Sequence, residues 1–168
     1  MSEYYGLMVK TKPTHPGGLR GRPSFLFSQL GFHADRRFGE MLEPLDVSAR
    51  QFGLLHTLAG TDGQSQQQLS AALRIHRNVM VGMVDELERS ELVERRRHPS
   101  DRRAYAVHLT DTARKLLPRV ETILDGCDDE LLGLLDPGER RTLVRLLQRV
   151  SDGAGLAPGV HPGYDATE

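Results

Sequence analysis

The most constraining feature of this sequence is a short hairpin-like segment, which interrupts a chain whose apolar residues otherwise recur at helical spacing. Residues 92–98 and 103–109 have the composition of two strands. Pro99, Ser100 and Asp101 lie between them and are residue types that favour turns. The sequence therefore predicts a small β-hairpin attached to a helical body.

The second predicted strand alternates regularly, which is the pattern of a strand with one buried face. Its two faces consist of Ala104, Ala106 and His108 on one side and Tyr105, Val107 and Leu109 on the other. We expect only one of these faces to pack against the helical body.

The hairpin is also the most basic part of the chain. Residues 94–103 contain five arginines against Glu94 and Asp101, a local net charge of +3. The whole chain has a net charge of −1, so its bulk charge would not attract nucleic acid. Any nucleic-acid site must therefore be a local patch, and the hairpin is the candidate.

Two helices are predicted near the start of the chain. Apolar residues between Ser24 and Pro44 recur at helical spacing and indicate a first helix that stops before the proline. Ser48 and Gln51 form a capping-box pattern, which predicts a second helix that ends at Gly60.

A third and a fourth helix are predicted on either side of a tight turn. Ser65 and Gln68 repeat the capping-box pattern at the start of the third helix. The residues expected to face inward on this helix are Leu69, Ala72 and Leu73. After a turn at Ile75 and His76, the fourth helix has the apolar residues Met80, Met83, Val84 and Leu87. This arrangement predicts a helix-turn-helix unit.

Two more helices are expected after the hairpin. Thr110 or Asp111 can cap a fifth helix, whose apolar positions continue to Leu134. The residues Asp136, Pro137 and Glu139 supply an N-cap, an N1 proline and an N3 carboxylate for a sixth helix. The predicted fold class is mainly α with a small β-hairpin wing.

The order of these elements, with four short motifs, resembles the MarR family of bacterial regulators over roughly residues 25–150. The motifs are Val84-Asp85-Glu86-Leu87-Glu88, Leu92-Val93-Glu94-Arg95, Asp101-Arg102-Arg103 and Leu109-Thr110. The resemblance implies a winged helix-turn-helix fold with N- and C-terminal dimerisation helices. Glu91 departs from the glycine usual in the family, and Gly82 departs from a polar or arginine position.

The chain is expected to divide into five parts. Residues 1–23 form a flexible basic arm that could touch phosphate, with a solvated tail as the favoured alternative. Residues 24–45 are the N-terminal dimerisation helix, residues 46–110 the DNA-binding lobe, residues 111–151 the C-terminal dimerisation helices, and residues 152–168 a flexible, unstructured tail. Apolar residues on the first, fifth and sixth helices exceed what one small lobe can cover, which indicates a homodimer.

The second helix of a helix-turn-helix places its N-terminal part in the major groove of double-stranded DNA. The candidate residues on this side are Ser65, Gln66, His76, Arg77, Asn78, Val79, Val81 and Gly82. Asn78 could form paired hydrogen bonds with adenine, although helix capping is an equal alternative. Arg77 is expected to contact phosphate more than a base, and Val79 or Val81 could contact a thymine methyl group.

The wing candidates are Arg95, Arg97, His98, Ser100, Asp101, Arg102 and Arg103. By resemblance, Arg103 enters the minor groove and Asp101 orients its guanidinium through a charge-assisted pair. About half of the other arginines are expected to contact phosphate, and the rest to face solvent or pair with acids of the protein. Binding is therefore expected to depend strongly on salt.

The resemblance also implies a small-molecule effector, with a possible pocket that includes His33, Arg36, Arg37 and His56. For each of these four residues, an exposed or core role is the favoured alternative. No cofactor or metal site is predicted, because the seven histidines are scattered and show no zinc-ligand spacing. Cys127 has two aspartates beside it, so no reactive thiol is expected.

Together, these patterns and the resemblance to the MarR family predict a cytoplasmic homodimeric transcriptional regulator, a repressor in sign, that binds a near-palindromic operator; release by a ligand is what the resemblance implies. An enzyme is not expected, since the sequence contains no nucleophile elbow, phosphate loop or metal motif. Neither a signal peptide nor an apolar run of membrane-spanning length is found, so no membrane partner is expected. The alternative is a winged-helix module that binds another protein.

Overall fold

The computed structural model describes residues 18–97 and 105–165. The chain forms two compact units, residues 1–37 and residues 38–168. The first unit contains a 3-10 helix, η1 (Gly18–Gly21), and most of helix α1 (Pro23–Leu42). Five large apolar side chains of this part of α1 are exposed by 37% to 76%, namely Phe25, Leu26, Phe27, Leu30 and Phe32.

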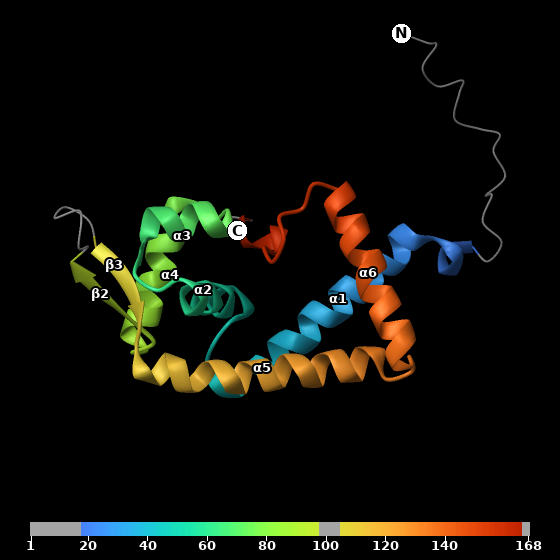
Figure 1. Ribbon diagram of the computed structural model, residues 1–168, viewed down its shortest axis with the longest axis horizontal. Coiled ribbons are helices and arrows are strands. Elements are labelled where there is room, and N and C mark those ends of the chain that lie inside the picture. The colour runs from blue at the N-terminus through green and yellow to red at the C-terminus, as the bar shows by residue number, and fades with distance from the viewer. Residues whose placement is uncertain (1–17, 98–104, 166–168) are drawn as a thin grey trace, which may run out of the picture. The chain divides into compact units, whose positions relative to one another are not determined.

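The second unit contains the remaining elements (Figure 1). In chain order they are η2 (Glu43–Leu45), α2 (Ala49–Gly60), β1 (Gln64–Ser65), α3 (Gln66–Leu73), α4 (Arg77–Arg89), β2 (Val93–Arg97), β3 (Tyr105–Leu109), α5 (Asp111–Leu132), α6 (Pro137–Gly153) and η3 (Pro162–Asp165). In the described ranges, no helix is long and apolar enough to cross a membrane.

The helix starts follow from local capping. Ser48, Ser65 and Asp136 each accept a hydrogen bond from the backbone three residues later, and the side chain at that later position returns a bond to the backbone of the cap. These reciprocal bonds satisfy donors that a helix start would otherwise leave unpaired. Thr110, one of two predicted candidates, is the cap of α5. The predicted starts of α2, α3, α5 and α6 are confirmed.

The hairpin is part of a three-stranded antiparallel sheet in the order β1-β3-β2. Arg96 on β2 and Ser65 on β1 both lie opposite Ala106 on β3. The two-residue strand β1 was not predicted, because it is too short to show an alternating pattern. The paired parts of β2 and β3 lie within the predicted hairpin, and its turn, residues 98–104, is outside the described residues.

The prediction that β3 buries only one face is wrong. Ala106 and Val107 point to opposite faces, and both are completely buried, whereas Tyr105 is 56% exposed. The reason is that β3 is the central strand and contacts α2, α3 and α5. The alternating sequence pattern of β3 therefore did not predict that residues on both of its faces are buried.

The core of the second unit lies between the sheet, α2, α3, α4 and the first half of α5. Fully buried side chains include Leu54, Leu69, Met80 and Val120. Phe38 packs edge-on against Phe52, with 6.3 Å between the ring centroids. This core holds α4 and the wing strands as one body.

Ala72, which was predicted to face inward, is exposed, and the fifth helix ends before Leu134, the last of its predicted apolar positions. Ala72 lies on the outer side of α3, and Leu134 is fully exposed in the turn after α5, which ends at Leu132. Both fit the apolar spacing of their helices. The spacing could not show that α3 has one buried stripe of two leucines, or that α5 stops before Leu134.

The end of the chain is more ordered than the sequence predicts. An unstructured tail was expected from residue 152, but α6 continues to Gly153 and is followed by two hydrogen-bonded turns and η3. The segment 154–163 returns toward the end of α3 (Figure 1).

Candidate nucleic-acid interface

Helix α4 begins at a histidine cap. Nδ1 of His76 accepts a hydrogen bond from the backbone N–H of Asn78 at 3.3 Å, which leaves the other ring nitrogen to face outward as a donor in the neutral ring. Asn78 is therefore not the cap of α4, which removes the capping alternative for this residue. Its side chain is exposed beside that of Arg77.

The candidate residues on α4 divide by burial. Arg77, Asn78, Val81 and Gly82 are exposed, whereas Val79 is half-buried and packs against the core. A Cβ atom built on Gly82 would meet nothing within 4 Å. The outer face of α4 is thus a short polar turn followed by a small residue, with no bulky side chain at position 82.

The two candidates at the start of α3 are engaged locally. The hydroxyl of Ser65 accepts a bond from Gln68 N at 3.3 Å and donates to Gln68 Oε1 at 2.9 Å. The side-chain nitrogen of Gln66 is buried without a protein partner. Ser65 and Gln66 therefore do not expose their side-chain polar atoms as Arg77 and Asn78 on α4 do.

Arg95 is tied to α4. Its guanidinium pairs with Asp85 and Glu88, and its backbone N–H donates to Glu88 Oε1 at 3.1 Å. Partial burial would lower the pKa of Arg95, but the two carboxylates outweigh it and raise the pKa above its usual value. Arg95 therefore fastens β2 to α4, the second helix of the helix-turn-helix and hence its recognition helix. The Arg95 side chain is only 22% exposed.

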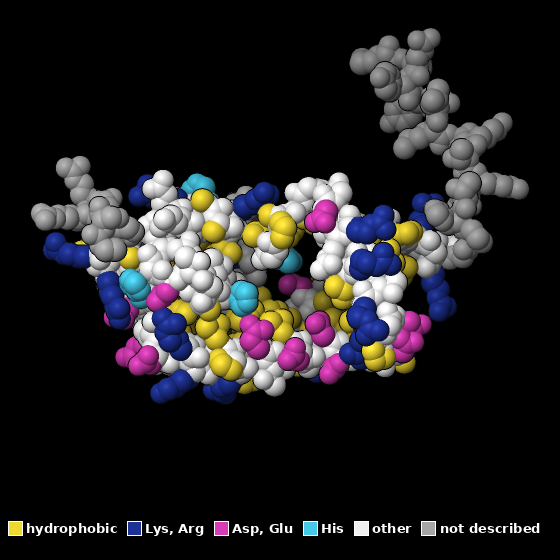
Figure 2. Space-filling view, viewed as in Figure 1, with side chains coloured by type: hydrophobic (Ala, Val, Ile, Leu, Met, Phe, Trp, Pro, Cys, Tyr) yellow, Lys and Arg dark blue, Asp and Glu magenta, His cyan; other side chains and the backbone are white. Residues whose placement is uncertain are grey.

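Of the other wing residues, Arg96 and Arg97 point to opposite faces of β2. Arg96 pairs with Glu94, two residues away on the same face of β2. Arg97 is exposed at the end of the strand. The remaining candidates, His98, Ser100, Asp101, Arg102 and Arg103, lie outside the described residues. Figure 2 shows Lys and Arg side chains both around the sheet and along α6.

A Schellman turn connects α4 to β2. Leu92 N donates to Leu87 O at 2.9 Å, Glu91 N donates to Glu88 O at 3.1 Å, and Glu91 has a φ of 55°. This left-handed conformation is the one that glycine adopts most easily. Glu91, which stands where the resemblance leads us to expect glycine, thus lies at a position whose backbone geometry favours glycine.

Asp62 joins three elements behind the interface. It accepts from Leu109 N at 3.0 Å and from Arg114 Nη2 at 2.7 Å, and its other contact is His108 Nδ1 at 3.3 Å. Burial acts to raise the pKa of Asp62, but these donors and the charges of His108 and Arg114 outweigh it and lower the pKa. The contacts fix the turn after α2 to β3 and to the start of α5.

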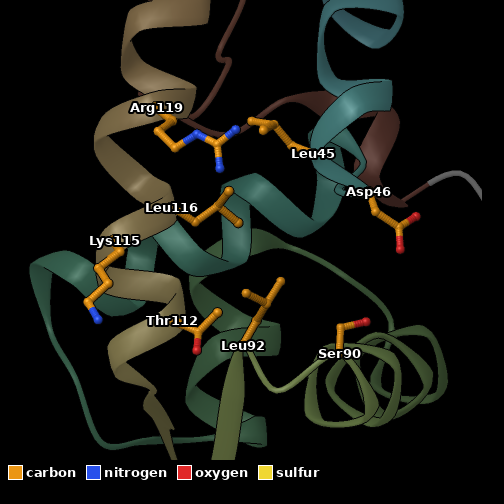
Figure 3. A pocket seen from close by; sticks show the side chains of 8 residues that line it. All are labelled: Leu45, Asp46, Ser90, Leu92, Thr112, Lys115, Leu116 and Arg119. Atoms are coloured by element: carbon orange, nitrogen blue, oxygen red, sulfur yellow. The ribbon is translucent and has the colours of Figure 1, made fainter.

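A cleft beside the turn from α4 to β2 and the first half of α5 does not contain the residues predicted for an effector. It has a volume of about 400 Å³ and is lined by Leu45, Asp46, Ser90, Leu92, Thr112, Lys115, Leu116 and Arg119. Leu92 and Leu116 point into it, and Arg119 extends from α5 toward Leu45 (Figure 3). The cleft therefore combines the apolar side chains of Leu92 and Leu116 with the guanidinium of Arg119.

The structure places the four predicted pocket residues elsewhere. His33, Arg36 and Arg37 belong to α1 in the first unit. His56 is on α2 in the second unit, where its ring packs on Phe52 and its Nε2 lies 3.7 Å from Glu121 Oε1. The side chain of His56 is 65% exposed.

Comparison with known proteins identifies the family. A family model described as the MarR family matches residues 47–105. A putative transcriptional regulatory protein for the hcr operon of Thauera aromatica is 32% identical in an alignment of 130 residues, and the match covers 73% of this chain and 78% of that protein. The chain belongs to the MarR family. This family consists of transcriptional regulators, which are not enzymes.

Solved structures agree with this assignment. Apo wild-type MarR from E. coli is 27% identical, with a TM-score of 0.67, over 77% of this chain and 96% of that one. A mutant of E. coli MarR in complex with operator DNA is also 27% identical, with a TM-score of 0.66, over 76% and 91% of the two chains. The transcriptional repressor CouR, bound to a 23-mer DNA duplex, is 28% identical, with a TM-score of 0.71, over 85% and 99%. The predicted fold and the predicted class of DNA-binding regulator are confirmed for this MarR-family protein.

Proposed function

We propose that this MarR-family protein is a cytoplasmic homodimeric repressor that binds a near-palindromic duplex. The observation that carries the proposal is the exposed first turn of α4, where Arg77 and Asn78 are presented by a helix that shares its core with the wing strands β2 and β3. Relatives of the same fold have been solved on DNA, which supports the same use of this surface. Two copies related by a two-fold axis would insert their α4 helices about 34 Å apart.

The dimer would form through the terminal helices. None of the residues of α6 is buried, and its apolar residues Leu143, Leu146, Leu147 and Val150 recur at helical spacing. Of these, Leu146, Leu147 and Val150 are 40% to 53% exposed. A helix with this stripe needs a partner to cover it. The exposed apolar residues of α1 support the same assignment for that helix.

The proposed DNA contacts fall into two groups. Arg77, Asn78, Val81 and Gly82 face the major groove, with Asn78 as the base-reading residue. In the wing, Arg97, His98, Ser100 and Arg102 contact the backbone, and Arg103, oriented by Asp101, enters the minor groove. Ser65 and Gln66 would act through the backbone of the α3 start, and Arg95 through its hold on α4.

The decisive experiment is selection of bound duplexes from a random pool, followed by binding measurements over a series of salt concentrations. We expect enrichment of a near-palindrome and a steep decrease of affinity with salt. If no palindromic duplex is enriched by a folded protein, the regulator proposal fails and the alternative of a protein-binding winged helix gains support.

A variant of the wing tip tests the minor-groove contact. Arg103→Ala should weaken binding to the selected duplex by about 1–3 kcal/mol, the usual cost of one well-placed charged contact. Titration of labelled duplex at moderate salt measures this loss. Unchanged affinity would remove Arg103 from the interface.

We also propose that the cleft below Arg119 is the effector site. The guanidinium would pair with an anionic group, and Leu92 and Leu116 would contact an apolar body. A screen of small organic anions by thermal shift should find ligands that release the duplex. Arg119→Gln should abolish this response, whereas His56→Gln should preserve it; the reverse result would favour the pocket expected from the sequence.

A further inference from the structure

The segment after α6 has a local sequence that directs it back toward the DNA-binding lobe. Helix α6 ends in a Schellman turn, in which Leu156 N donates to Ser151 O at 3.1 Å and Gly155 has a φ of 72°. A second turn follows, with Val160 N donating to Ala157 O at 3.2 Å and Gly159 at a φ of 71°. Pro158 and Gly159 occupy the positions that a type II turn prefers. Two glycine turns thus give residues 154–163, here called the strap, a defined path.

The strap contacts the predicted DNA-binding lobe at two places, the start of α2 and the end of α3. Arg50 at the start of α2 donates from Nη2 to Gly163 O at 3.2 Å. On its apolar side the strap and the end of α3 enclose a cavity of about 180 Å³, lined by Leu73, Arg74, Leu156, Ala157, Val160, His161 and Pro162. Ala157 and Val160 are half-buried as a result. The strap therefore bridges the ends of two helices of the lobe.

The place of contact is the turn before the recognition helix. Arg74 ends α3 with a φ of 53°, and His76, the cap of α4, follows two residues later. In helix-turn-helix complexes, the start of the second helix enters the groove beside the phosphate backbone. After Arg149 the sequence contains three acidic residues and no Lys or Arg. None of these acidic residues lies within residues 154–163, so the strap brings bulk rather than charge to a corner that an incoming phosphate backbone would approach.

We propose that the strap is autoinhibitory: it covers the α3–α4 turn in the free protein and is displaced when a duplex binds. The proposal rests on the proposed function, since it requires that α4 enters DNA. Displacement has a thermodynamic cost, because only molecules with an open strap are competent to bind. A strap closed in about nine of ten free molecules weakens binding about tenfold.

The test uses the full chain and two variants, with the duplex selected as described above. A chain that ends at Leu156 keeps the Schellman turn of α6 and lacks residues 157–163 of the strap. Val160→Asp introduces a charge on the side of the strap that faces α3. Both should bind the duplex severalfold to about tenfold more tightly than the full chain. The charge control, Asp165→Asn with Glu168→Gln, keeps the strap and should bind no more than about twofold more tightly than the full chain. If this control reproduces the whole gain, charge alone acts and the strap proposal is wrong.

Hydrogen exchange gives a second readout that does not depend on affinity. Exchange in peptides covering residues 156–163 should become faster when the full chain binds the duplex, because the strap leaves α3. Slower exchange, or unchanged affinity of folded Val160→Asp, would overturn the proposal. If the truncated chain does not fold, the affinity of Val160→Asp and the hydrogen exchange of the full chain still test the proposal. If neither the full chain nor the variants select a duplex, the proposed function fails instead.

Discussion

Glu91 has a backbone conformation that glycine would adopt at lower energy. Its φ of 55° is set by the Schellman turn that ends α4, and the Cβ atom of any residue except glycine is crowded there. The turn persists because Thr110 Oγ1 donates to Glu91 O at 2.7 Å and Leu92 is buried immediately after it. Tertiary contacts therefore hold a locally unfavourable residue in place.

Glu91→Gly should stabilise the protein by about 1 kcal/mol, because it removes the strain of the left-handed conformation. Chemical denaturation monitored by circular dichroism measures the change in the free energy of unfolding. Ser90→Gly is the matched control, since Ser90 has a φ of −84° and gains nothing from glycine. A loss of stability in Glu91→Gly would show that the Glu91 side chain contributes more than the strain costs.

Asp62 predicts a measurable dependence of stability on pH. Its pKa is 3.8 in the reference state and lower in the folded protein, so the unfolded chain binds more protons as the pH falls toward this value. The stabilisation is complete above about pH 5 and is lost as the pH falls below 3.8 toward the folded pKa. Asp62→Asn should reduce the free energy of unfolding by about 1–2 kcal/mol at pH 7 and flatten its decrease from about pH 5 to pH 3. Asp128→Asn, a change at an exposed position, should alter neither the free energy of unfolding nor its pH dependence. If the stability of Asp62→Asn falls with pH as steeply as that of the unsubstituted protein, Asp62 is not the source of the pH dependence.

At the scale of elements, the wing and the recognition helix are fastened together. Arg95 on β2 bridges Asp85 and Glu88, which are one turn apart on α4. The same helix packs its other side, Met80, Met83 and Leu87 among them, into the core. As a result, a change in the position of α4 is transmitted to the base of the wing.

Arg95→Gln and Arg97→Gln should separate positioning from phosphate contact. Loss of Arg95 leaves two carboxylates unpaired, which should reduce the free energy of unfolding by about 1–2 kcal/mol and weaken duplex binding without changing its salt dependence. Loss of exposed Arg97 should leave stability unchanged and reduce the slope of log affinity against log salt by about one. Titrations at four salt concentrations measure both slopes. A reduced slope for Arg95→Gln would mean that Arg95 contacts phosphate.

At the scale of the whole molecule, the described chain exposes more apolar surface than a monomer needs. Helix α6 has no buried residue, although it has the regular apolar stripe of a packed helix. Two of its four arginines, Arg145 and Arg149, lie between the apolar residues and keep the helix amphipathic. A second copy of the chain is the partner proposed to cover it.

Leu147→Glu should shift the protein from dimer to monomer, because a carboxylate in the middle of the stripe would have to be desolvated on association. Sedimentation equilibrium measures the change, and weaker binding to a two-half-site duplex should accompany it. Gln148→Glu adds the same charge at the neighbouring exposed position and should remain dimeric. A dimeric Leu147→Glu variant would place the interface elsewhere.

The sequence by itself determined the order of the helices, the caps of α2, α3 and α6, and the family. Ser48, Ser65 and Asp136 were readable because each cap bonds within three residues, so the signal is local. The motifs of the hairpin were readable for the same reason. The exposure of Arg77 and Asn78 also agreed with the helix-turn-helix pattern.

Tertiary structure decided the features that depend on partners far along the chain. Arg95 and Arg97 are alike in sequence, but only Arg95 meets two carboxylates of α4. Ala106 is buried because β3 became the central strand, and the strap is ordered because Arg50 and Leu73 lie at the place where it returns. Bonds between distant residues depend on how the helices pack, and no pattern of neighbouring residues contains that information.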